Sequence, residues 1–570
     1  MQKIKQTIAE KIAEKIKSEF PAAELGGGDI LSMFEYPPDP ALGDLALPCF
    51  KLSKSLRRSP MQIADAIAEG LSGEEIEKVE SVKGYINVFI SNEFLAKKTV
   101  SEILVKKDDF GKNCDGEGKT VVLDYSSPNV AKPFHLGHLG TTVIGHSLRR
   151  LFEFSGYRCI GVNHLGDWGT SFGKQLVAYK KWGSREMIEE QGVDGLVALY
   201  QRFHDEAENK PEMYDEARAE FTKLENGDPE NTELWKWVIG ISIDEYKRTY
   251  KQLDIEFDYY TGESFYTDKM PAQVEKMREK NLLKIDDGAS IVDLDDYNMP
   301  PCLILKRDGS TLYPTRDISA AVYRHETFDF DKCVYVTSAG QSLHFAQWFK
   351  VVELMGYDWA NKLVHVPYGT MSINGAKLGT RSGNVVWLKQ LLNMSVDKVR
   401  GVIDEKNPNL ENKEQVAEEV GVGAIVFNYL SNSRIKDISF DLEGALDFNG
   451  NTGPYVQYTY ARCCSILEKS GASPEAAELK LTEAAEATLV KALSRFPEKV
   501  KEALAQYEPS VITRYILDVA AAFNRFYHDC QILSAEDEAV KATRISLTAA
   551  TKTVLGNAFG LICLKKPEKI

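Results

Sequence analysis

Residues 124–138 read Asp-Tyr-Ser-Ser-Pro-Asn-Val-Ala-Lys-Pro-Phe-His-Leu-Gly-His, and this stretch decides the fold. The apolar run of residues 120–125 is typical of a buried strand, and residues 139–152 keep the apolar spacing of a helix. A second apolar run begins near Cys159. The order strand, loop, helix, strand predicts a βαβ unit that holds nucleotide phosphates at the helix N-terminus. Gly137 lets the backbone approach such a ligand closely.

Two histidines close the stretch, in the pattern His135-Leu-Gly-His138. A lone His-x-x-His is more often chance or half of a metal site, so the longer pattern matters. The four residues resemble the HIGH signature of class I aminoacyl-tRNA synthetases, and residues 127–138 resemble the longer form found in arginyl-tRNA synthetases. The resemblance implies that both histidines stabilise the phosphates of ATP while the α-phosphate is attacked.

A glycine-rich loop at residues 376–383 stands in the place of the KMSKS loop, which closes over pyrophosphate in class I enzymes. Only its first lysine, Lys377, is kept, and Thr380 replaces the second. Arginyl enzymes commonly depart in this way, and a lysine just upstream of HIGH then supplies the missing charge. Lys132 stands at that position. The resemblance implies catalysis by His135, His138, Lys132 and Lys377, Mg²⁺ on the triphosphate, and ATP binding by Lys132, His135, Gly137, His138, Lys377 and Arg381.

Tyr313 and Asp317 lie four residues apart, which places them on one helix face if a helix begins at Pro314. A guanidinium stays charged when buried, so a pocket selective for arginine must supply negative charge. The resemblance implies that Tyr313 and Asp317 bind the arginine side chain, helped by Asp124 at the end of the first strand, where the family often has glutamate. It assigns the amino and carboxylate groups of arginine to Ser127, Asn129 and Gln341.

The 570 residues predict three or four domains. A polar, glycine-rich break near residues 111–118 ends an N-terminal domain, 1–112. Residues 118–400 form the catalytic domain, with an acidic helical insertion at about 177–295 in which we recognise no chemistry. Residues 401–570 show only amphipathic helices and predict an all-α domain. The predicted class is α/β: a class I synthetase Rossmann-type parallel sheet with an N-terminal α+β domain and a C-terminal all-α anticodon-binding bundle.

Two further segments resemble the tRNA-binding parts of arginyl-tRNA synthetases. The first is Gly84-Tyr-Ile-Asn-Val-Phe-Ile90 in the additional N-terminal domain, and it implies tRNA contacts by Asn87 and Phe89. The second is the opening of the anticodon-binding domain at residues 447–462, and it implies contacts by Tyr455 and Arg462. For all four residues, packing within the fold remains an open alternative.

The composition is that of an ordinary globular protein, with 43% hydrophobic and 27% charged residues. No apolar run reaches the length of a membrane span, and the N-terminal stripe of isoleucines among lysines and glutamates is unlike a signal peptide. A cytoplasmic location is therefore expected. The nine cysteines are scattered without a Cys-x-x-Cys, which argues against a zinc site and a disulfide framework. A net charge of −15 does not exclude RNA binding, because RNA is held by local basic surface.

Together, the resemblances imply ATP-dependent activation of L-arginine to arginyl-adenylate and its transfer to the 3′-terminal adenosine of tRNA(Arg), by a monomer without membrane contact. Two alternatives stay open: a class I synthetase for another amino acid, and a non-catalytic tRNA-binding paralogue. Residues 169–173 also satisfy Gly-x-Ser-x-Gly, the nucleophile elbow of serine hydrolases. That interpretation leaves the histidine pair and the helical C-terminal region unexplained, so we disfavour it.

Overall fold

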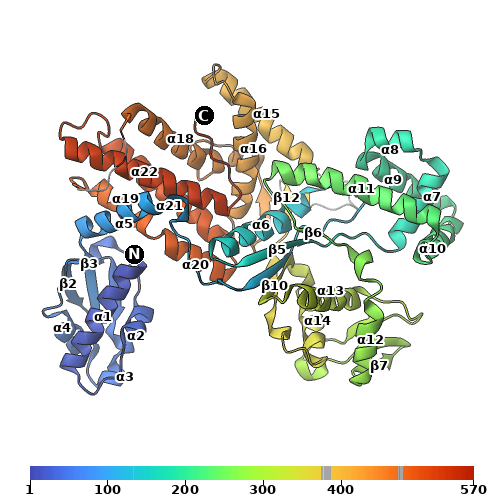
Figure 1. Cartoon of the computed structure of the whole chain (residues 1–570), viewed down its shortest axis with the longest axis horizontal. Coiled ribbons are helices and arrows are strands. Elements are labelled where there is room, and N and C mark those ends of the chain that lie inside the picture. Colours follow the sequence, from blue (N-terminus) through green and yellow to red (C-terminus); the bar gives the residue numbers. More distant parts are fainter. Residues whose placement is uncertain (133, 374–375, 378–386, 473, 475–478) are drawn as a thin grey trace.

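Three antiparallel strands and several helices form the N-terminal domain (Figure 1). A computed structural model of the chain describes every residue except 133, 374–375, 378–386, 473 and 475–478. The strands β1 (Leu45–Pro48), β3 (Tyr85–Ile90) and β2 (Ile76–Val82) pair in that order, and the helices are α1 (Gln2–Glu19), α2 (Gly27–Met33), α3 (Ser53–Leu56) and α4 (Pro60–Ala68). Ile4, Ile8, Ile12 and Ile16 of α1 are all buried, which confirms the predicted amphipathic helix. The helix α5 (Asn92–Lys106) links this domain to the rest.

A five-stranded parallel sheet forms the centre of the catalytic region. Its strand order is β11-β10-β4-β5-β6, so the chain winds outward in both directions from the neighbours β4 and β10. In such doubly wound sheets, ligands bind beyond the carboxyl ends of the strands where the winding reverses. The bounds are β4 (Thr120–Asp124), β5 (Arg158–Asn163), β6 (Tyr259–Tyr260), β10 (Lys332–Ser338) and β11 (Leu363–Tyr368).

Alternation along β4 builds a core on each face of this sheet. Val121 and Leu123 belong to the core that includes α6 (Leu139–Phe154), while Val122 belongs to the core that includes α13 (Tyr313–Phe328) and α14 (Ser342–Leu354). The predicted strand, helix and second strand around residues 124–138 are therefore confirmed. Because helices cover both faces, the central strands β4, β5 and β10 are largely buried, as expected of parallel sheets.

The insertion is helical only in its first part. Five helices lie at the right of Figure 1: α7 (Thr170–Trp182), α8 (Arg185–Gln191), α9 (Val193–Asn209), α10 (Glu212–Glu225) and α11 (Pro229–Gln252). The prediction of helices alone for 177–295 is wrong beyond residue 252, because β6 returns there to the central sheet and α12 (Met270–Glu279) is the one longer helix that follows in this stretch. After α12, a second sheet is made by β7 (Leu283–Asp286), β8 (Ala289–Val292) and β9 (Cys302–Leu305). The strands β7 and β8 of this hairpin have four residues each, which is too few for a clear period, although the Asp287-Gly288 turn between them is typical of a hairpin.

The C-terminal part is a helical bundle, but it begins differently from the prediction. The helix α15 already starts at Leu388, and a short strand, β14 (Ile438–Phe440), pairs with β12 (Met371–Ile373). The prediction of helices alone beyond residue 400 is therefore wrong at β14, because three residues are too few to show a strand period. The remaining elements are β13 (Ala376–Lys377), α15 (Leu388–Lys406), α16 (Lys413–Leu430), α17 (Leu442–Ala445), α18 (Gly453–Ser470), α19 (Ala484–Ser494), α20 (Phe496–Gln506), α21 (Ser510–Asp529) and α22 (Glu538–Leu561).

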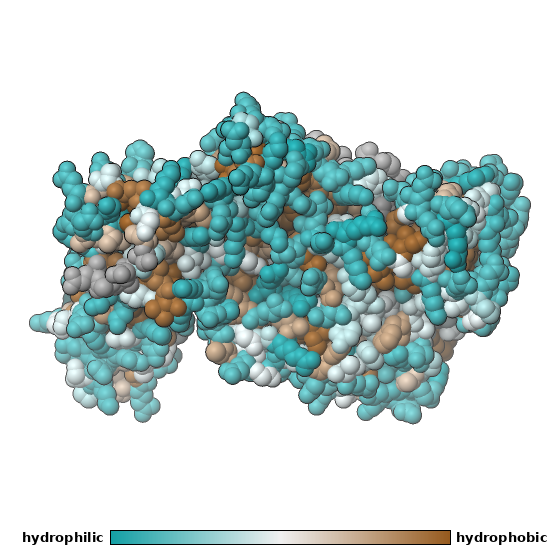
Figure 2. All heavy atoms as spheres, turned by 45° about the horizontal axis from the view of Figure 1, so that its top comes forward, coloured by the Kyte–Doolittle hydropathy of each residue, from teal (hydrophilic) through white to brown (hydrophobic). Residues whose placement is uncertain are grey.

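The face of the molecule in Figure 2 is largely hydrophilic, with apolar residues gathered in small separate patches. Among the helices in the described part of the chain, none is both long enough and apolar enough to cross a membrane. All nine cysteines are free thiols.

Candidate active site

The turn after β4 adopts a backbone that non-glycine residues rarely use. Ser126, Ser127 and Ala131 have φ angles of 73°, 48° and 58°. Such conformations cost free energy and persist where surrounding contacts hold them, often at functional sites. The turn lies at the carboxyl end of β4 beside β10, which is the ligand-binding position of a doubly wound sheet.

The insertion helix α11 holds this turn in place. The Tyr246 hydroxyl donates to the carbonyls of Asn129 and Lys132, at 2.7 and 2.8 Å. The Ala131 N–H donates to Ser242 Oγ at 3.1 Å. The sequence had suggested no chemistry in the insertion, yet its last helix supports the backbone of the predicted ATP site. Tyr246, an aromatic residue within the polar run at the end of this helix, was the signal in the sequence that could have pointed to this contact.

The two histidines of the turn form a stacked pair. Their ring centroids are 3.8 Å apart, and Phe134 stacks on His138 at 5.0 Å. His135 Nδ1 accepts from the Gly137 N–H, and His138 Nδ1 accepts from the His135 N–H. Burial lowers the pKa of His135 and lowers the pKa of His138 to about 3. The positive charge of Lys132 also lowers the pKa of both histidines.

Both rings are therefore neutral near pH 7, and each has its hydrogen on Nε2, because Nδ1 is an acceptor. The pair offers two Nε2–H donors to phosphate oxygens rather than two charges. Gly137 is required here, since a side chain would begin 2.8 Å from the His135 ring. The charge must come from Lys132, which is half-buried beside the pair.

The loop predicted to close over pyrophosphate lies mostly outside the described residues. Arg381 and the rest of residues 378–383 belong to the part left out, and only the backbone of Lys377 is described, in β13. The chain returns beside the histidine pair. Trp387 pairs with the His135 backbone, and the Leu388 N–H donates to the Phe134 carbonyl at 3.0 Å. Trp387 and Leu388, which are the first described residues after this loop, thus contact the turn.

Asp124 already has two partners within the protein. Its Oδ1 accepts from Ser127 Oγ at 2.9 Å, and its Oδ2 lies 2.8 Å from an Nη of Arg324 on α13. The Arg324 side chain is only 1% exposed, so this ion pair is buried. Asp124 was predicted to help bind the substrate guanidinium, but the structure gives it an internal guanidinium instead. Arg324 is a residue that sequence reasoning missed, and no local signal in α13 marks it.

The predicted pair on α13 has the expected geometry. The helix begins at Tyr313 with Pro314 in its first turn, so Tyr313 and Asp317 lie on one face. Tyr313 is exposed, and Asp317 Oδ2 lies 2.6 Å from His344 Nε2 on α14. His344 follows Gln341, which is exposed at the carboxyl end of β10. The structure therefore brings the α13 pair and the segment after β10 together.

Two more carboxylates, Glu263 and Asp167, line the same region and were missed. Glu263 Oε2 lies 2.8 Å from Nη1 of Arg316, which is the residue before Asp317. Burial raises the pKa of Glu263 to about 7, because the pairing with Arg316 offsets that burial only in part and Asp167 and Asp317 lie nearby. Asp167 accepts from the N–H and hydroxyl of Ser264, at 2.9 and 2.6 Å. An acid-rich cluster of this kind suits a cationic side chain, and we call it the acidic pocket below.

Ser127 and Asn129 occupy the turn between the two halves of the site. Ser127 is half-buried against Asp124, and Asn129 is exposed beside Gly166, with which its backbone forms a bridge. The histidine pair thus lies at one end of the turn and the acidic pocket at the other.

The predicted tRNA residues are mostly packed into their domains. Asn87 is 4% exposed in the middle strand of its sheet, and Phe89 is half-buried under the ammonium of Lys78, 4.1 Å from the ring centroid. Tyr455 accepts from Asn524 Nδ2 at 2.9 Å. Packing, the open alternative, therefore describes Asn87 and Tyr455 well.

Arg462 lies beside two exposed aromatic rings on the surface of the helical bundle. Its guanidinium lies 5.0 Å from the ring centroid of Tyr458 and 4.7 Å from that of Tyr527, and it donates to Asn524 Oδ1. Both rings are exposed, by 43% and 46%. Exposed aromatics beside a guanidinium form a stacking platform for unpaired bases.

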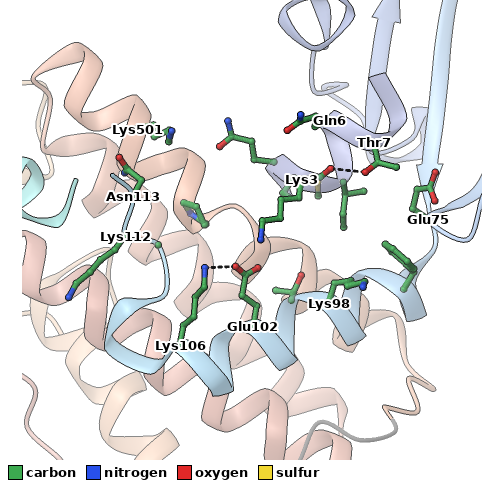
Figure 3. A pocket seen from close by; sticks show the side chains of 17 residues that line it. Lys3, Gln6, Thr7, Glu75, Lys98, Glu102, Lys106, Lys112, Asn113 and Lys501 are labelled. Carbon is green, nitrogen blue, oxygen red and sulfur yellow. Dashed lines mark hydrogen bonds and ion pairs between the residues drawn. The ribbon is translucent and has the colours of Figure 1, made fainter. Parts of the chain in front are cut away.

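A separate cavity of about 830 Å³ lies between α1, α5 and α20 (Figure 3). Lysines from all three helices and from the loop after α5 surround it: Lys3, Lys98, Lys106, Lys112 and Lys501. Lys106 is paired with Glu102 at 2.7 Å, and Lys501 with Asp115 at 2.8 Å. None of the predicted site residues lines this cavity, so it is not part of the active site.

Comparison with known proteins finds matches along almost the whole chain. The family described as "tRNA synthetases class I (R), catalytic domain" matches residues 99–442. The "Arginyl tRNA synthetase N terminal domain" matches residues 2–90, and the "DALR anticodon binding domain" matches residues 456–570. The catalytic match extends beyond the boundary near residue 400 that the sequence suggested, in accord with the pairing of β14 to β12.

Full-length relatives agree. The arginine–tRNA ligase of Alkaliphilus metalliredigens is 50% identical over the whole of both chains, and that of Clostridioides difficile is 48% identical, also over the whole of both. Among solved structures, arginyl-tRNA synthetase from Plasmodium falciparum is 26% identical with a TM-score of 0.82, covering 100% of this chain and 99% of the other. The Thermus thermophilus enzyme, at 24% identity and TM-score 0.83 over 99% and 100%, shares the fold.

Proposed function

The chain belongs to the arginyl-tRNA synthetase family of class I enzymes, and on that premise we propose which residues carry each step. The enzyme is an aminoacyl-tRNA ligase. The carboxylate of L-arginine attacks the α-phosphate of ATP, arginyl-adenylate forms, and pyrophosphate leaves. A ribose hydroxyl of the 3′-terminal adenosine of tRNA(Arg) then attacks the arginyl carbonyl, and AMP leaves. No side-chain nucleophile is required, so catalysis rests on positioning and charge.

In this proposal the phosphates of ATP lie at the histidine turn, residues 132–138. His135 and His138 donate from Nε2 to phosphate oxygens, Gly137 allows the phosphates to approach the backbone closely, and Lys132 supplies positive charge. Lys377 and Arg381 complete the charge on the pyrophosphate side. A Mg²⁺ ion would be held by triphosphate oxygens and water, which are ligands that it prefers, and would add positive charge at the phosphates. The described residues contain no cluster of three histidine, cysteine or acidic side chains that could hold a metal ion.

Arginine lies across the turn, with its side chain toward α13. Tyr313, Asp317 and Glu263 bind the guanidinium, and Glu263 is added to the residues expected from the sequence because it lies in the same acidic pocket. Asp124 acts nearer the other end of the substrate, since Arg324 already neutralises it. The amino and carboxylate groups are held by Ser127, Asn129 and Gln341. The observation that carries the proposal is the meeting of this acidic pocket with the phosphate turn where β4 and β10 end.

The tRNA contacts are proposed on two outer domains. Arg462, with the neighbouring exposed rings, binds anticodon bases. Tyr455 supports Arg462 from within the bundle, because both side chains are hydrogen-bonded to Asn524. The N-terminal sheet with Asn87 and Phe89 lies toward the body of the tRNA. The enzyme acts as a cytoplasmic monomer.

Pyrophosphate exchange into ATP tests the proposal, measured for each amino acid with and without total tRNA. We expect exchange with arginine when tRNA is present. Absence of arginine-dependent exchange would contradict the proposed function. Exchange with another amino acid alone would favour a different class I specificity, and tRNA binding without any exchange would favour a non-catalytic paralogue.

Asp317→Ala tests the guanidinium pocket. Removing a partner of a buried charge costs about 3 to 5 kcal/mol, so we expect the kcat/KM for arginine to fall by roughly 10²-fold or more. The KM for ATP should change little. Glu353→Ala, an exposed acid on α14 paired with Lys350, is the matched control. Wild-type arginine kinetics in Asp317→Ala would remove Asp317 from the pocket.

A further inference from the structure

The pocket proposed for the substrate guanidinium contains a guanidinium of the protein itself. Arg316 lies on α13 between Tyr313 and Asp317. Its Nη1 is 2.8 Å from Glu263 Oε2, and its Cζ is 5.3 Å from the centroid of the Tyr313 ring. Both members of the ion pair are mostly buried, with side chains 16% and 14% exposed.

These contacts are the ones that an arginine substrate would make. A guanidinium pairs with carboxylates through its planar fork and lies over aromatic faces. Glu263 and the Tyr313 ring offer both interactions, and Arg316 uses both. One carboxylate and one ring cannot serve two guanidinium groups in the same geometry, so a substrate side chain that reaches Glu263 competes with Arg316.

The bonding of Arg316 is incomplete in comparison with a structural arginine of the same chain. Arg544, in the helical bundle, donates from Nε to Glu486, from Nη1 to the Gln531 carbonyl and from Nη2 to Thr482 Oγ1. Arg316 Nε is buried without a hydrogen-bond partner among the described residues, and one oxygen of Glu263 is its ion-pair contact. An arginine held on one side is easier to displace than one whose donors are all satisfied.

We propose that Arg316 determines specificity by competing with the amino-acid side chain for Glu263. This inference rests on the proposed function, because it assumes that arginine binds in this pocket. A substrate guanidinium can replace Arg316, because it makes the same ion pair with Glu263 and the same contact with the Tyr313 ring. An ammonium is a compact, strongly hydrated point charge without a fork, and a ureido group is neutral, so neither replaces Arg316 well. The internal arginine thereby rejects lysine and citrulline, as a built-in competitor that acts against the wrong ligands.

Arg316→Gln, assayed by pyrophosphate exchange with tRNA present, tests this idea. We expect the KM for arginine to fall severalfold because the competitor is gone. We expect the kcat/KM for lysine to rise by about tenfold or more, so that discrimination between arginine and lysine shrinks. Arg316→Lys should give a smaller change in the same direction, because its ammonium is a weaker competitor. Arg278→Gln, on the exposed face of α12 and paired with Glu275, should leave both parameters unchanged.

A higher KM for arginine in Arg316→Gln, with lysine still inactive, would overturn the proposal and make Arg316 a support of the pocket. Unchanged kinetics for both amino acids would overturn it as well. Cooperative thermal unfolding of each variant checks that it is folded, and if Arg316→Gln does not fold, the direction of the KM change in Arg316→Lys decides. Lack of arginine-dependent exchange in the wild-type enzyme would instead mean that the proposed function has failed.

Discussion

At the scale of single residues, the pocket is defined by how each of its acids is compensated. Asp124 has the buried guanidinium of Arg324, and Asp317 has His344. Glu263 has only the one-sided contact with Arg316, and its pKa remains raised to about 7 by burial. The acid whose internal partner contacts it on one side gains most from exchanging that partner for a substrate guanidinium. Glu263 is therefore the residue whose ionisation should control arginine binding.

The KM for arginine should depend on pH through Glu263. The carboxyl must be ionised to pair with a guanidinium, and a pKa of about 7 means that it takes up a proton as the pH falls below 7. We therefore expect the KM for arginine to rise as the pH falls from about 8 to 6, and to be flat above that window. Steady-state kinetics at saturating ATP measure this dependence.

Glu263→Gln provides the control for that pH profile, because glutamine does not titrate. Its KM for arginine should be higher than that of the wild type at pH 8 and nearly independent of pH. The KM for ATP serves as an internal reference in both proteins. A wild-type KM for arginine that stays constant between pH 6 and 8 would speak against the role of Glu263.

At the scale of elements, the active turn depends on how closely α6 approaches β4. Gly145 lies in the middle of α6, where an added Cβ would be 2.3 Å from the Tyr125 ring. Tyr125 is fully buried between Asp124 and the strained serines, and its hydroxyl bonds His146 Nδ1 at 3.0 Å. Helix α6 therefore fixes the turn from one side, while α11 fixes it from the other.

Gly145→Ala should destabilise the protein and damage the site together. Overpacking a buried contact costs about 1 to 3 kcal/mol, and moving Tyr125 shifts the neighbouring Asp124. We expect a lower midpoint of denaturant unfolding and a lower kcat/KM for arginine. Gly240→Ala is the matched control, since Gly240 is exposed in α11 and an added Cβ would meet nothing within 4 Å. That change should stabilise the helix by up to about 1 kcal/mol. Equal stability of the two variants would contradict the packing argument.

At the scale of the whole molecule, the two regions that carry the proposed RNA contacts, the N-terminal domain and the helical bundle, both lie to the left of the catalytic sheet in Figure 1. The net charge of −15 means that binding must come from local surface rather than from general attraction. The exposed platform on the bundle combines Arg462 with two rings, and stacking on such a surface tolerates salt better than phosphate contacts do.

Tyr458→Ala should weaken tRNA binding without affecting the amino-acid pocket. A base stacked on an aromatic side chain is worth about 1 to 3 kcal/mol, which corresponds to a roughly 5- to 150-fold increase in the KM for tRNA. The KM for arginine should stay unchanged. Tyr297→Ala removes a comparably exposed tyrosine from the catalytic region and serves as the control. An unaltered KM for tRNA in Tyr458→Ala would exclude this ring from the interface.

The sequence by itself determined the features that depend on neighbours along the chain. The strand, turn and helix around residues 124–138, the amphipathic helix α1 and the start of α13 follow from periodicity, proline and glycine within short windows. The histidine turn and the family resemblance could also be recognised from the sequence, because both depend on short runs of residues in a fixed order. The short strand β14 and the hairpin β7–β8 escaped, since their few residues leave little pattern to detect.

Only the tertiary structure decided how the charges of the site are paired. Arg324 reaches Asp124 across 200 positions of sequence, and Glu263, Arg316 and His344 converge from segments that are far apart in the sequence. These partners are fixed by the strand order β11-β10-β4-β5-β6, which brings the ends of distant segments together at one edge. A charge has no periodicity that would reveal its partner, because its energy depends on distance and burial in the folded chain.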